Sequence, residues 1–183
     1  MWLMNLTENL LSITRVENGS MKLQMEPQLL TEVFDEALRH VDRQVKDHVV
    51  HAEVKDELLM AKMDVHLIIQ VIINIVNNAI KYTPVGSEIN LSAYRKGDWV
   101  YIQIADNGLG MDDEIKKHLF DMFYTAYQGK GDNRRGLGLG LNLCKSIVMA
   151  HGGKISVSDN APQGAVFTFT LPWEKVDIRS SDC

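Results

Sequence analysis

Cysteine is scarce in this sequence, and no cysteine pair has the spacing of a cross-link or a metal site. Cys144 and Cys183 are the only two among 183 residues, and no CxxC pair occurs. This excludes a disulfide framework and a cysteine-type zinc site, so we expect a reducing compartment. Cys144 lies in an apolar stretch typical of a helix, and we predict that it packs in the core.

Long hydrophobic runs and an excess of basic charge are missing as well. No segment reaches the roughly 18 uninterrupted apolar residues of a membrane span, and residues 1–11 lack the basic start of a signal peptide. The net charge of −5 argues against broad nucleic-acid binding. With 45% hydrophobic and 23% charged residues, the composition predicts a soluble globular chain of one domain with a short appendage.

The most informative segment is Asp64–Thr83, an apolar stretch with a polar stripe. If it is wound as a helix, at about 100° per residue, the apolar side chains share one face: Val65, Ile68, Ile69, Ile72, Ile75, Val76 and Ala79. The opposite face carries Gln70, Asn74, Asn77, Asn78 and Lys81. A face that only needed solubility would carry glutamate and lysine. Because amide oxygens coordinate hard cations and lysine contacts phosphate, the stripe predicts one wall of a nucleotide site.

The other segments predict helices mixed with antiparallel hairpins. Helices are expected at 1–18, 31–46, 112–122 and 139–151, and strands at 22–25, 49–54, 58–63, 88–94, 99–105, 154–157 and 165–171, with Pro172 ending the last strand. Without strict βαβ alternation, this order indicates an α+β fold, a two-layer α/β sandwich with helices on one face of a mixed sheet. Apolar residues in 1–18 follow coiled-coil spacing, which predicts half of a helical hairpin; the alternative is a helix packed on its own domain.

A second wall is predicted by Asp106–Met111, the sequence DNGLGM, directly after the strand 99–105. A carboxylate at a strand end can accept a hydrogen bond from an exocyclic amine such as that of adenine. Gly108 and Gly110 would let the backbone come close to a ring. The same residues could instead form a turn that an aspartate or asparagine side chain caps.

A third wall is predicted by Gly136–Leu141, the sequence GLGLGL, at the start of the helix 139–151. Backbone N–H groups there can contact phosphate, although the segment matches neither the Walker nor the Rossmann pattern and could be a hinge. The preceding loop, Tyr124–Arg135, carries cations and indicates a lid, the alternative being a solvated surface loop. Gly164 could admit a ligand or only make a turn.

Five motifs follow one another in a fixed order: NIVNNAIKYT, DNGLGM, FDMFY, GLGLGL and QGAVFTFTLP. This series resembles the N, G1, F, G2 and G3 boxes of the catalytic and ATP-binding domain of sensor histidine kinases, over about residues 22–172. Each box is modest alone, but five in order are specific. The resemblance implies the Bergerat ATP-binding fold, shared with gyrase- and MutL-type ATPases. The stretch ENLLSITRVENG resembles the end of a dimerisation hairpin, and with the last box it looks most like Kdp-type potassium-sensing kinases.

The resemblance also implies roles for single residues. Asn78 would coordinate Mg²⁺ with Asn74 in support, Lys81 would contact phosphate, and Asp106 would accept the adenine amine. Ala165 stands where relatives commonly have threonine, so any contact of that hydroxyl is absent. The further nucleotide contacts that the resemblance implies are Tyr82, Gly108, Gly110, Met111, Phe123, Arg135, Gly136, Leu137, Gly138, Leu139, Gly140, Leu141 and Thr168.

The implied reaction is transfer of the ATP γ-phosphate to a histidine. No histidine of this chain stands in an H-box such as HELRTP, so the acceptor is expected on another part of the parent protein. Hydrolysing relatives tend to have a glutamate four residues before the metal-binding asparagine, and here that residue is Asn74. An amide is no general base near neutral pH, which favours transfer over hydrolysis. The alternatives are an ATPase of the same fold and a non-catalytic nucleotide-binding module.

The domain organisation that follows has three parts. Residues 1–20 are expected to be the truncated end of the dimerisation hairpin, 21–173 the catalytic ATP-binding domain and 174–183 a disordered tail. The implied partners are the phosphoacceptor domain of the same parent protein and a response regulator, and the parent is expected to be a homodimer. No nucleic acid and no membrane contact are expected for this chain. The implied location is cytoplasmic, in a parent anchored to a membrane.

Overall fold

The computed structural model describes residues 22–41, 43–124 and 138–175. In chain order, the elements are β1 (Glu26–Leu29), α2 (Leu30–Arg39), a 3-10 helix η1 (Arg43–Asp47), β2 (Val49–Val54), β3 (Met60–Met63), α3 (Val65–Tyr82), β4 (Glu88–Lys96), β5 (Trp99–Asp106), α4 (Asp113–His118), α5 (Gly140–Ala150), β6 (Ile155–Asp159) and β7 (Ala165–Glu174). The expected helix 1–18 and the tail after 175 lie outside the described residues, so the domain boundaries stay predictions.

The strands form one mixed sheet of seven strands in the order β1-β3-β7-β5-β4-β2, with β6 also paired to β7. The pair β2–β4 is parallel, and the other pairs are antiparallel. The hairpin β4–β5 turns at Gly97, which adopts a positive φ of 63°, as the Lys96-Gly97 signal predicts. The expected α+β fold with a mixed sheet is confirmed.

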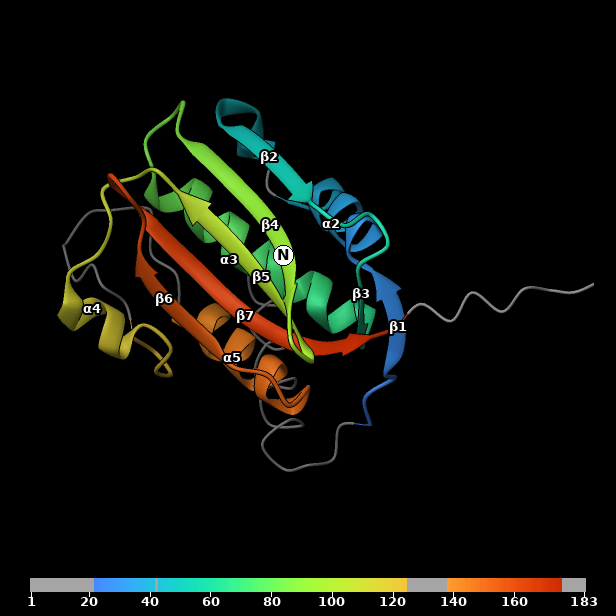
Figure 1. The fold of residues 1–183 in the computed structure, drawn as a ribbon. Coiled ribbons are helices and arrows are strands. Elements are labelled where there is room, and N and C mark those ends of the chain that lie inside the picture. The colour runs from blue at the N-terminus through green and yellow to red at the C-terminus, as the bar shows by residue number, and fades with distance from the viewer. Residues whose placement is uncertain (1–21, 42, 125–137, 176–183) are drawn as a thin grey trace, which may run out of the picture.

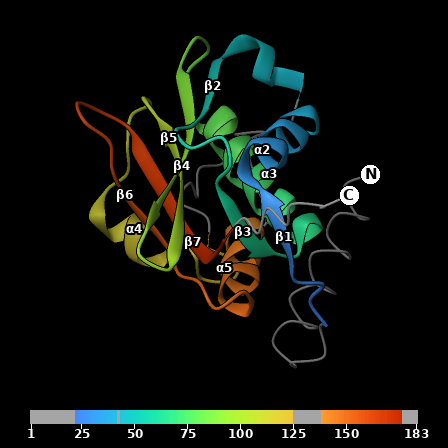
Figure 2. The ribbon, with the colours of Figure 1, turned by 45° about the vertical axis from the view of Figure 1, so that its right-hand side comes forward.

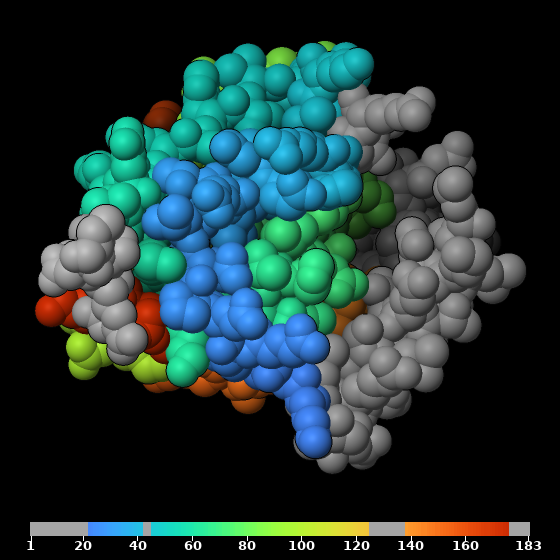
Figure 3. All heavy atoms as spheres, turned by 90° about the vertical axis from the view of Figure 1, so that its right-hand side faces the viewer, coloured from blue at the N-terminus to red at the C-terminus, as the bar shows by residue number. Residues whose placement is uncertain are grey.

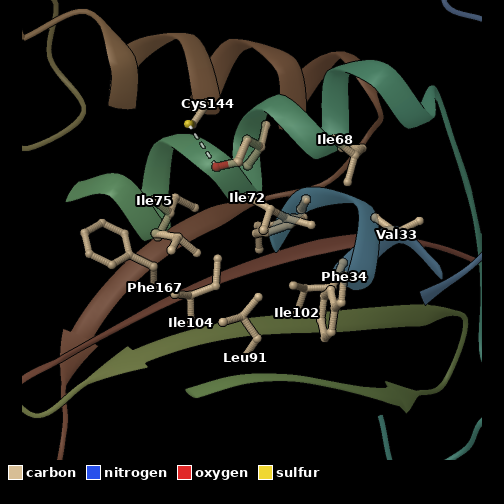
Figure 4. Packing of buried hydrophobic residues seen from close by; sticks show 14 of the residues in the cluster. Val33, Phe34, Ile68, Ile72, Ile75, Leu91, Ile102, Ile104, Cys144 and Phe167 are labelled. Carbon is tan, nitrogen blue, oxygen red and sulfur yellow. Dashed lines mark hydrogen bonds between the residues drawn. The ribbon is translucent and has the colours of Figure 1, made fainter. Parts of the chain in front are cut away.

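Helices α2, α3 and α5 cover one face of the sheet, as Figures 1 and 2 show from two directions. The burial of β4, β5 and β7 alternates along each strand, so one face of the sheet packs on the helices. In the core, Ile68, Ile72 and Ile75 of α3 point toward Leu91, Ile102 and Ile104 of the strands (Figure 4). This packing fixes α3 along the middle of the helical layer.

The predicted apolar face of α3 is correct in part. Ile68, Ile72, Ile75, Val76 and Ala79 are buried, whereas Val65 and Ile69 are only half-buried, and Val71 and Ile80 are buried in addition. The buried surface is wider than one stripe because α5 packs on the flank of α3. There, the Cys144 thiol lies 3.8 Å from the Val71 carbonyl oxygen (Figure 4). Burial raises the pKa of Cys144 to about 12, and its predicted core position is confirmed.

Two predictions near the N-terminus are wrong. The first strand is Glu26–Leu29 rather than 22–25, because it pairs with β3 in register from Glu26 opposite Met63. The helix expected at 31–46 ends at Arg39, where His40 N–H bonds to Ala37 O three residues back, and a separate 3-10 helix follows. Figure 3 shows this N-terminal part, in blue and cyan, lying over the green α3.

Two further boundaries differ from the sequence-based expectation. Strand β7 continues through Pro172 to Glu174. Trp173 N–H donates to Asp98 O on the β5 side, so the nitrogen of Pro172 faces the opposite side of β7. On that side β6 pairs only up to Phe169 and β3 pairs only from Trp173, so no partner needs a hydrogen bond from Pro172. Helix α4 spans only Asp113–His118 rather than 112–122, because the chain continues in a tighter turn from Asp121 N–H to His118 O.

Helix α3 is also the one described helix long and apolar enough to cross a membrane by length and composition. It has 18 residues with a mean hydropathy of 1.3. A core helix passes the same test, and α3 packs between the sheet and two neighbouring helices. Its apolar character is therefore accounted for by the core.

His151 joins the end of α5 to the start of α3. It is 3% exposed; its Nδ1 lies 2.7 Å from Ile147 O, and its Nε2 lies 3.0 Å from the Asp64 backbone nitrogen. Since a carbonyl only accepts and a backbone N–H only donates, the ring must carry its proton on Nδ1 and accept at Nε2. Burial is the main reason why the pKa of His151 is lowered.

We expect this histidine to make the fold acid-sensitive. A lowered pKa in the folded state means that the unfolded chain binds the proton more tightly, so stability is complete above about pH 6.5 and falls as the pH drops below it. Between pH 7.5 and 5.5, the unfolding free energy should fall on account of His151, by at most about 1.3 kcal/mol, the limit for one proton bound only by the unfolded chain. Urea unfolding of wild type and His151→Gln at both pH values measures this, with His40→Gln as a surface control. An equal fall in wild type and His151→Gln would contradict it.

Candidate functional site

One cavity of about 300 Å³ collects most of the predicted site residues. It lies between the C-terminal half of α3, the end of β5, α4 and the start of α5. Its size suits a small ligand. The lining residues are Asn78, Ala79, Lys81, Tyr82, Thr83, Asp106, Leu109, Gly110, Met111, Ile115, Leu119, Tyr124, Gly138, Gly140, Leu141, Ala165 and Phe167.

Asp106 is the buried carboxylate of this cavity. It ends β5, and it is 7% exposed. Its Oδ1 accepts from the backbone N–H of Gly108 at 2.9 Å and from that of Ala165 at 3.4 Å. Burial raises the pKa of Asp106, and the two backbone donors act in the opposite direction. Because both donors reach the same oxygen, Oδ2 is left to accept from a ligand.

The hydrogen bond from Gly108 N–H to Asp106 Oδ1 is the one expected if DNGLGM forms a turn capped by a side chain. The turn is present, and it holds the carboxylate that lines the cavity, so the two interpretations describe the same residues. Close packing requires glycine around it: a Cβ on Gly164 would lie 1.9 Å from Asp106 O. Gly164 has a φ of +118°, which other residues rarely adopt.

The polar stripe of α3 reaches the cavity at its C-terminal end. Asn78, Lys81 and Tyr82 line it, and the Lys81 ammonium lies 5.0 Å from the centre of the Tyr82 ring. Asn74, one turn earlier, does not line the cavity. Its Nδ2 is buried. Gln70 and Asn77 lie on the same stripe, outside the lining.

The GLGLGL segment is described only from Gly138 onward. Gly138, Gly140 and Leu141 line the cavity, whereas Leu139 is 2% exposed and belongs to the core. Arg135, Gly136 and Leu137, with most of the predicted lid, lie outside the described residues.

The residues on either side of segment 125–137 meet at the cavity. Phe123 N–H donates to Gly138 O at 3.1 Å, and both residues have a positive φ, 64° and 67°. The φ of Phe123 is uncommon for a residue with a side chain. Phe123 itself is 61% exposed and does not line the cavity, whereas its neighbour Tyr124 does.

Thr168 is a correction to the predicted site. Strand β7 alternates, with Phe167 and Phe169 buried on the helix side, so Thr168 lies on the opposite face of the sheet. There its hydroxyl lies 3.2 Å from the Gln103 Nε2 donor. Gly108 does not line the cavity either; it contributes through Asp106.

The sequence reasoning missed several apolar lining residues. Ile115 and Leu119 stand four apart on α4 and its end, a spacing that could have shown a shared face. Ala165 and Phe167 alternate on β7 and could have been placed on the inner face. Nothing in the sequence distinguished Leu109 or Thr83.

The lining can hold a metal ion only with help from its ligand. Among the described residues no cluster of three or more histidine, cysteine or acidic side chains could hold a metal. Asn78 offers a neutral amide oxygen, a type of atom that can coordinate Mg²⁺, and Lys81 in the same lining offers a positive charge. Mg²⁺ commonly uses one or two protein oxygens, waters and substrate phosphates. These residues therefore fit a Mg²⁺–nucleotide rather than a protein-only metal site.

Comparisons with known proteins agree with this geometry. The family model described as histidine kinase-, DNA gyrase B- and HSP90-like ATPase matches residues 63–175. The sensor protein KdpD of Clostridium acetobutylicum is 42% identical over 173 residues, 94% of this chain and 19% of that protein. The chain thus spans about a fifth of that relative's length.

Solved structures show the same fold. The catalytic domain of histidine kinase ThkA, in a nucleotide-free form, matches with a TM-score of 0.71 and 28% identity, over 81% of this chain and 95% of the other. ThkA in complex with the response regulator protein TrrA matches with a TM-score of 0.72 and 25% identity, over 93% of this chain and 48% of the other.

Proposed function

Since this chain belongs to the histidine kinase-, DNA gyrase B- and HSP90-like ATPase family, as an ATP-binding catalytic domain of the sensor histidine kinase type, we propose that its cavity positions Mg²⁺–ATP for transfer of the γ-phosphate to a histidine outside this chain. The observation that carries the proposal is one cavity with a buried carboxylate, Asp106, and a cation and an amide, Lys81 and Asn78, in its lining.

The base end of the site is built around Asp106. Its Oδ1 is held by two backbone donors, so Oδ2 accepts the adenine amine. Met111, Ile115 and Leu119 provide apolar surface for a flat ring beside it. A base with a carbonyl in place of the amine would put two acceptors together, which predicts selectivity for adenine over guanine.

The phosphate end of the site is built on α3 and the start of α5. The Lys81 ammonium attracts phosphate oxygens, and the Asn78 carbonyl oxygen supplies a neutral ligand. The glycines Gly138 and Gly140 leave room for the chain to approach an anion at a helix N-terminus. Mg²⁺, when bound, neutralises charge on the transferring phosphoryl group.

Transfer is favoured over hydrolysis because Asn74 stands four residues before Asn78, where hydrolysing relatives tend to have a glutamate, and the described carboxylate of the lining, Asp106, is assigned to the base end. An amide does not titrate near neutral pH, so Asn74 cannot take the role of such a glutamate. Positioning of the phosphate for in-line attack by an outside nucleophile needs no base on this domain. An ATPase remains the second candidate, and release of free phosphate without an acceptor would reveal it.

The acceptor and the partners are proposed to lie outside this chain. None of its six histidines lines the cavity, and His151 is buried between helices. The proposed acceptor is a histidine on the dimerisation domain of the same parent, the downstream partner is a response regulator, and the parent is a homodimer. The proposed location is the cytoplasmic side of a membrane-anchored parent, which suits the free thiol of Cys144.

The test mixes this chain with a separate hairpin domain that carries the acceptor histidine, with γ-labelled ATP and Mg²⁺. We expect acid-labile phosphohistidine on the hairpin and little free phosphate. Calorimetry with and without Mg²⁺ measures the nucleotide affinity in parallel. If ATP binds but no phosphohistidine forms, the transfer step is wrong, and if ATP does not bind, the whole proposal is wrong.

A further inference from the structure

The turn between β6 and β7 contacts two different walls of the nucleotide cavity. It runs from Asp159, the last residue of β6, to Gly164, just before β7. We propose that Asp159 and Asn160 are positioning residues that hold the base end of the site in shape, Asp159 through Lys116 and Asn160 through Asp106. This inference rests on the proposed function and names residues outside the five motifs that serve the same site.

Asn160 holds the wall that carries the buried carboxylate. Its Nδ2 donates to the backbone oxygen of Asp106 at 2.8 Å. Its own backbone N–H donates to Gly164 O at 3.0 Å, which closes the turn over the end of β5. Asp106 is therefore held at two places: Gly108 and Ala165 donate to its side-chain Oδ1, and Asn160 donates to its backbone carbonyl.

Asp159 holds the opposite wall, helix α4. Its Oδ1 lies 2.6 Å from the Lys116 ammonium, which also lies 2.9 Å from Asp113 Oδ1. The Lys116 side chain is 15% exposed, against 67% for Lys117 next to it. Figures 1 and 2 both show α4 at the edge of the sheet beside β6.

Helix α4 is fixed at its C-terminal end, where Leu119 and Phe120 pack against the core, so the contact of Lys116 matters for the helix itself. It spans six residues, none of them buried, and its N-cap makes no side-chain hydrogen bond. Its other ion pairs, from Lys117 and His118, stay within the segment 114–121. Of the ion pairs between described residues, Lys116–Asp159 is the one that joins α4 to the sheet.

The consequence concerns the base and not the phosphates. Ile115, beside Lys116, and Leu119 line the cavity from α4, and Asp106 lines it from β5. If the turn loses its contact with either wall, the residues that line the base end can shift, while Asn78 and Lys81 on α3 keep their places. Binding of ATP should weaken, and binding of a ligand that has only phosphates should not.

The test compares Lys116→Met, Asp159→Asn and Asn160→Ala with wild type, using calorimetry with Mg²⁺–ATP and with Mg²⁺–tripolyphosphate. We expect each variant to bind ATP about three- to tenfold more weakly, with tripolyphosphate binding unchanged. In transfer to a separate hairpin, KM for ATP should rise at an unchanged kcat. The double variant Lys116→Met/Asp159→Asn should lose no more than Lys116→Met alone, because that change already removes the pair with Asp159. Lys117→Met, on the same helix, is the matched control and should bind as wild type.

Hydrogen exchange keeps the test independent of nucleotide binding. In the absence of ligand, the amides of residues 106–120 should exchange faster in the three variants than in wild type or Lys117→Met, with the rest of the chain unchanged. Unchanged ATP affinity together with unchanged exchange overturns the inference, as does an equal loss for ATP and tripolyphosphate with lower stability, which would show a role in the fold alone. If wild type binds no ATP, the proposed function fails, and the exchange result still decides whether the turn holds these walls.

Discussion

Asp106→Asn is expected to weaken ATP binding by about ten- to a hundredfold while leaving the fold at least as stable. The amide that replaces the carboxylate can still accept from Gly108 and Ala165 through its oxygen, so the turn is kept. Its nitrogen then lies where Oδ2 was, and it turns a donor toward the donor of the adenine amine. The two donors cannot pair, and the buried base loses its recognition.

The stability part of this expectation follows from the direction of the pKa shift. Burial raises the pKa of Asp106, so the folded state disfavours the ionised carboxylate relative to the unfolded chain. At neutral pH this cost is present in wild type, and asparagine removes it. Affinity and stability should therefore change in opposite directions, which separates a site residue from a structural one.

Calorimetry with Mg²⁺–ATP and urea unfolding at pH 7 measure the two effects. Asp98→Asn in the exposed β4–β5 loop is the matched control, and it should change neither. Unaltered ATP affinity in Asp106→Asn would remove this carboxylate from the base site.

The parts of the fold that could be predicted are those in which the local pattern and the tertiary packing agree. The stretch Asp64–Thr83 is apolar on one side over five turns' worth of sequence, and it forms α3 within one residue at each end. The hairpin around Gly97 follows from alternation and turn chemistry, which act locally. Both are decided by neighbours in sequence.

The parts that could not be predicted depend on distant strands. Residues 22–25 alternate as well as Glu26–Leu29 does, and only pairing with β3 selects the latter. Pro172 would stop a strand with a partner on each side, but β7 has a gap between two neighbours at that point. The register of a strand depends on its neighbours in the sheet, so the sequence of one strand does not determine it.

The same distinction applies to the site. The polar members, Asn78, Lys81 and Asp106, stand out because amides and carboxylates on apolar elements are unusual, and the structure brings all three to one cavity. Thr168 was placed there by a motif alone, and the alternation of β7 turns it to the other face. Apolar lining residues such as Leu119 look like any core residue until the helix that carries them is placed.

Asn78→Asp is expected to reduce phosphoryl transfer to a separate hairpin by about a hundredfold. The new carboxylate lies in the same lining as Lys81, where the ATP phosphates are expected. Without Mg²⁺, the carboxylate should therefore repel the phosphates of the nucleotide. With Mg²⁺, it should compete with the phosphates for the ion. The two conditions should thus give different losses.

This difference is the decisive measurement. Without Mg²⁺, the affinity of Asn78→Asp for ATP should fall by about tenfold, because two negative groups meet without screening. With Mg²⁺ the loss should be smaller, because a bound cation would offset the added negative charge, yet transfer should stay low because the neutral amide donor of residue 78 is gone. Asn90→Asp on the exposed side of β4 adds the same charge elsewhere and should leave both affinities and transfer unchanged. Equal losses with and without Mg²⁺ would mean that residue 78 meets the nucleotide without the ion.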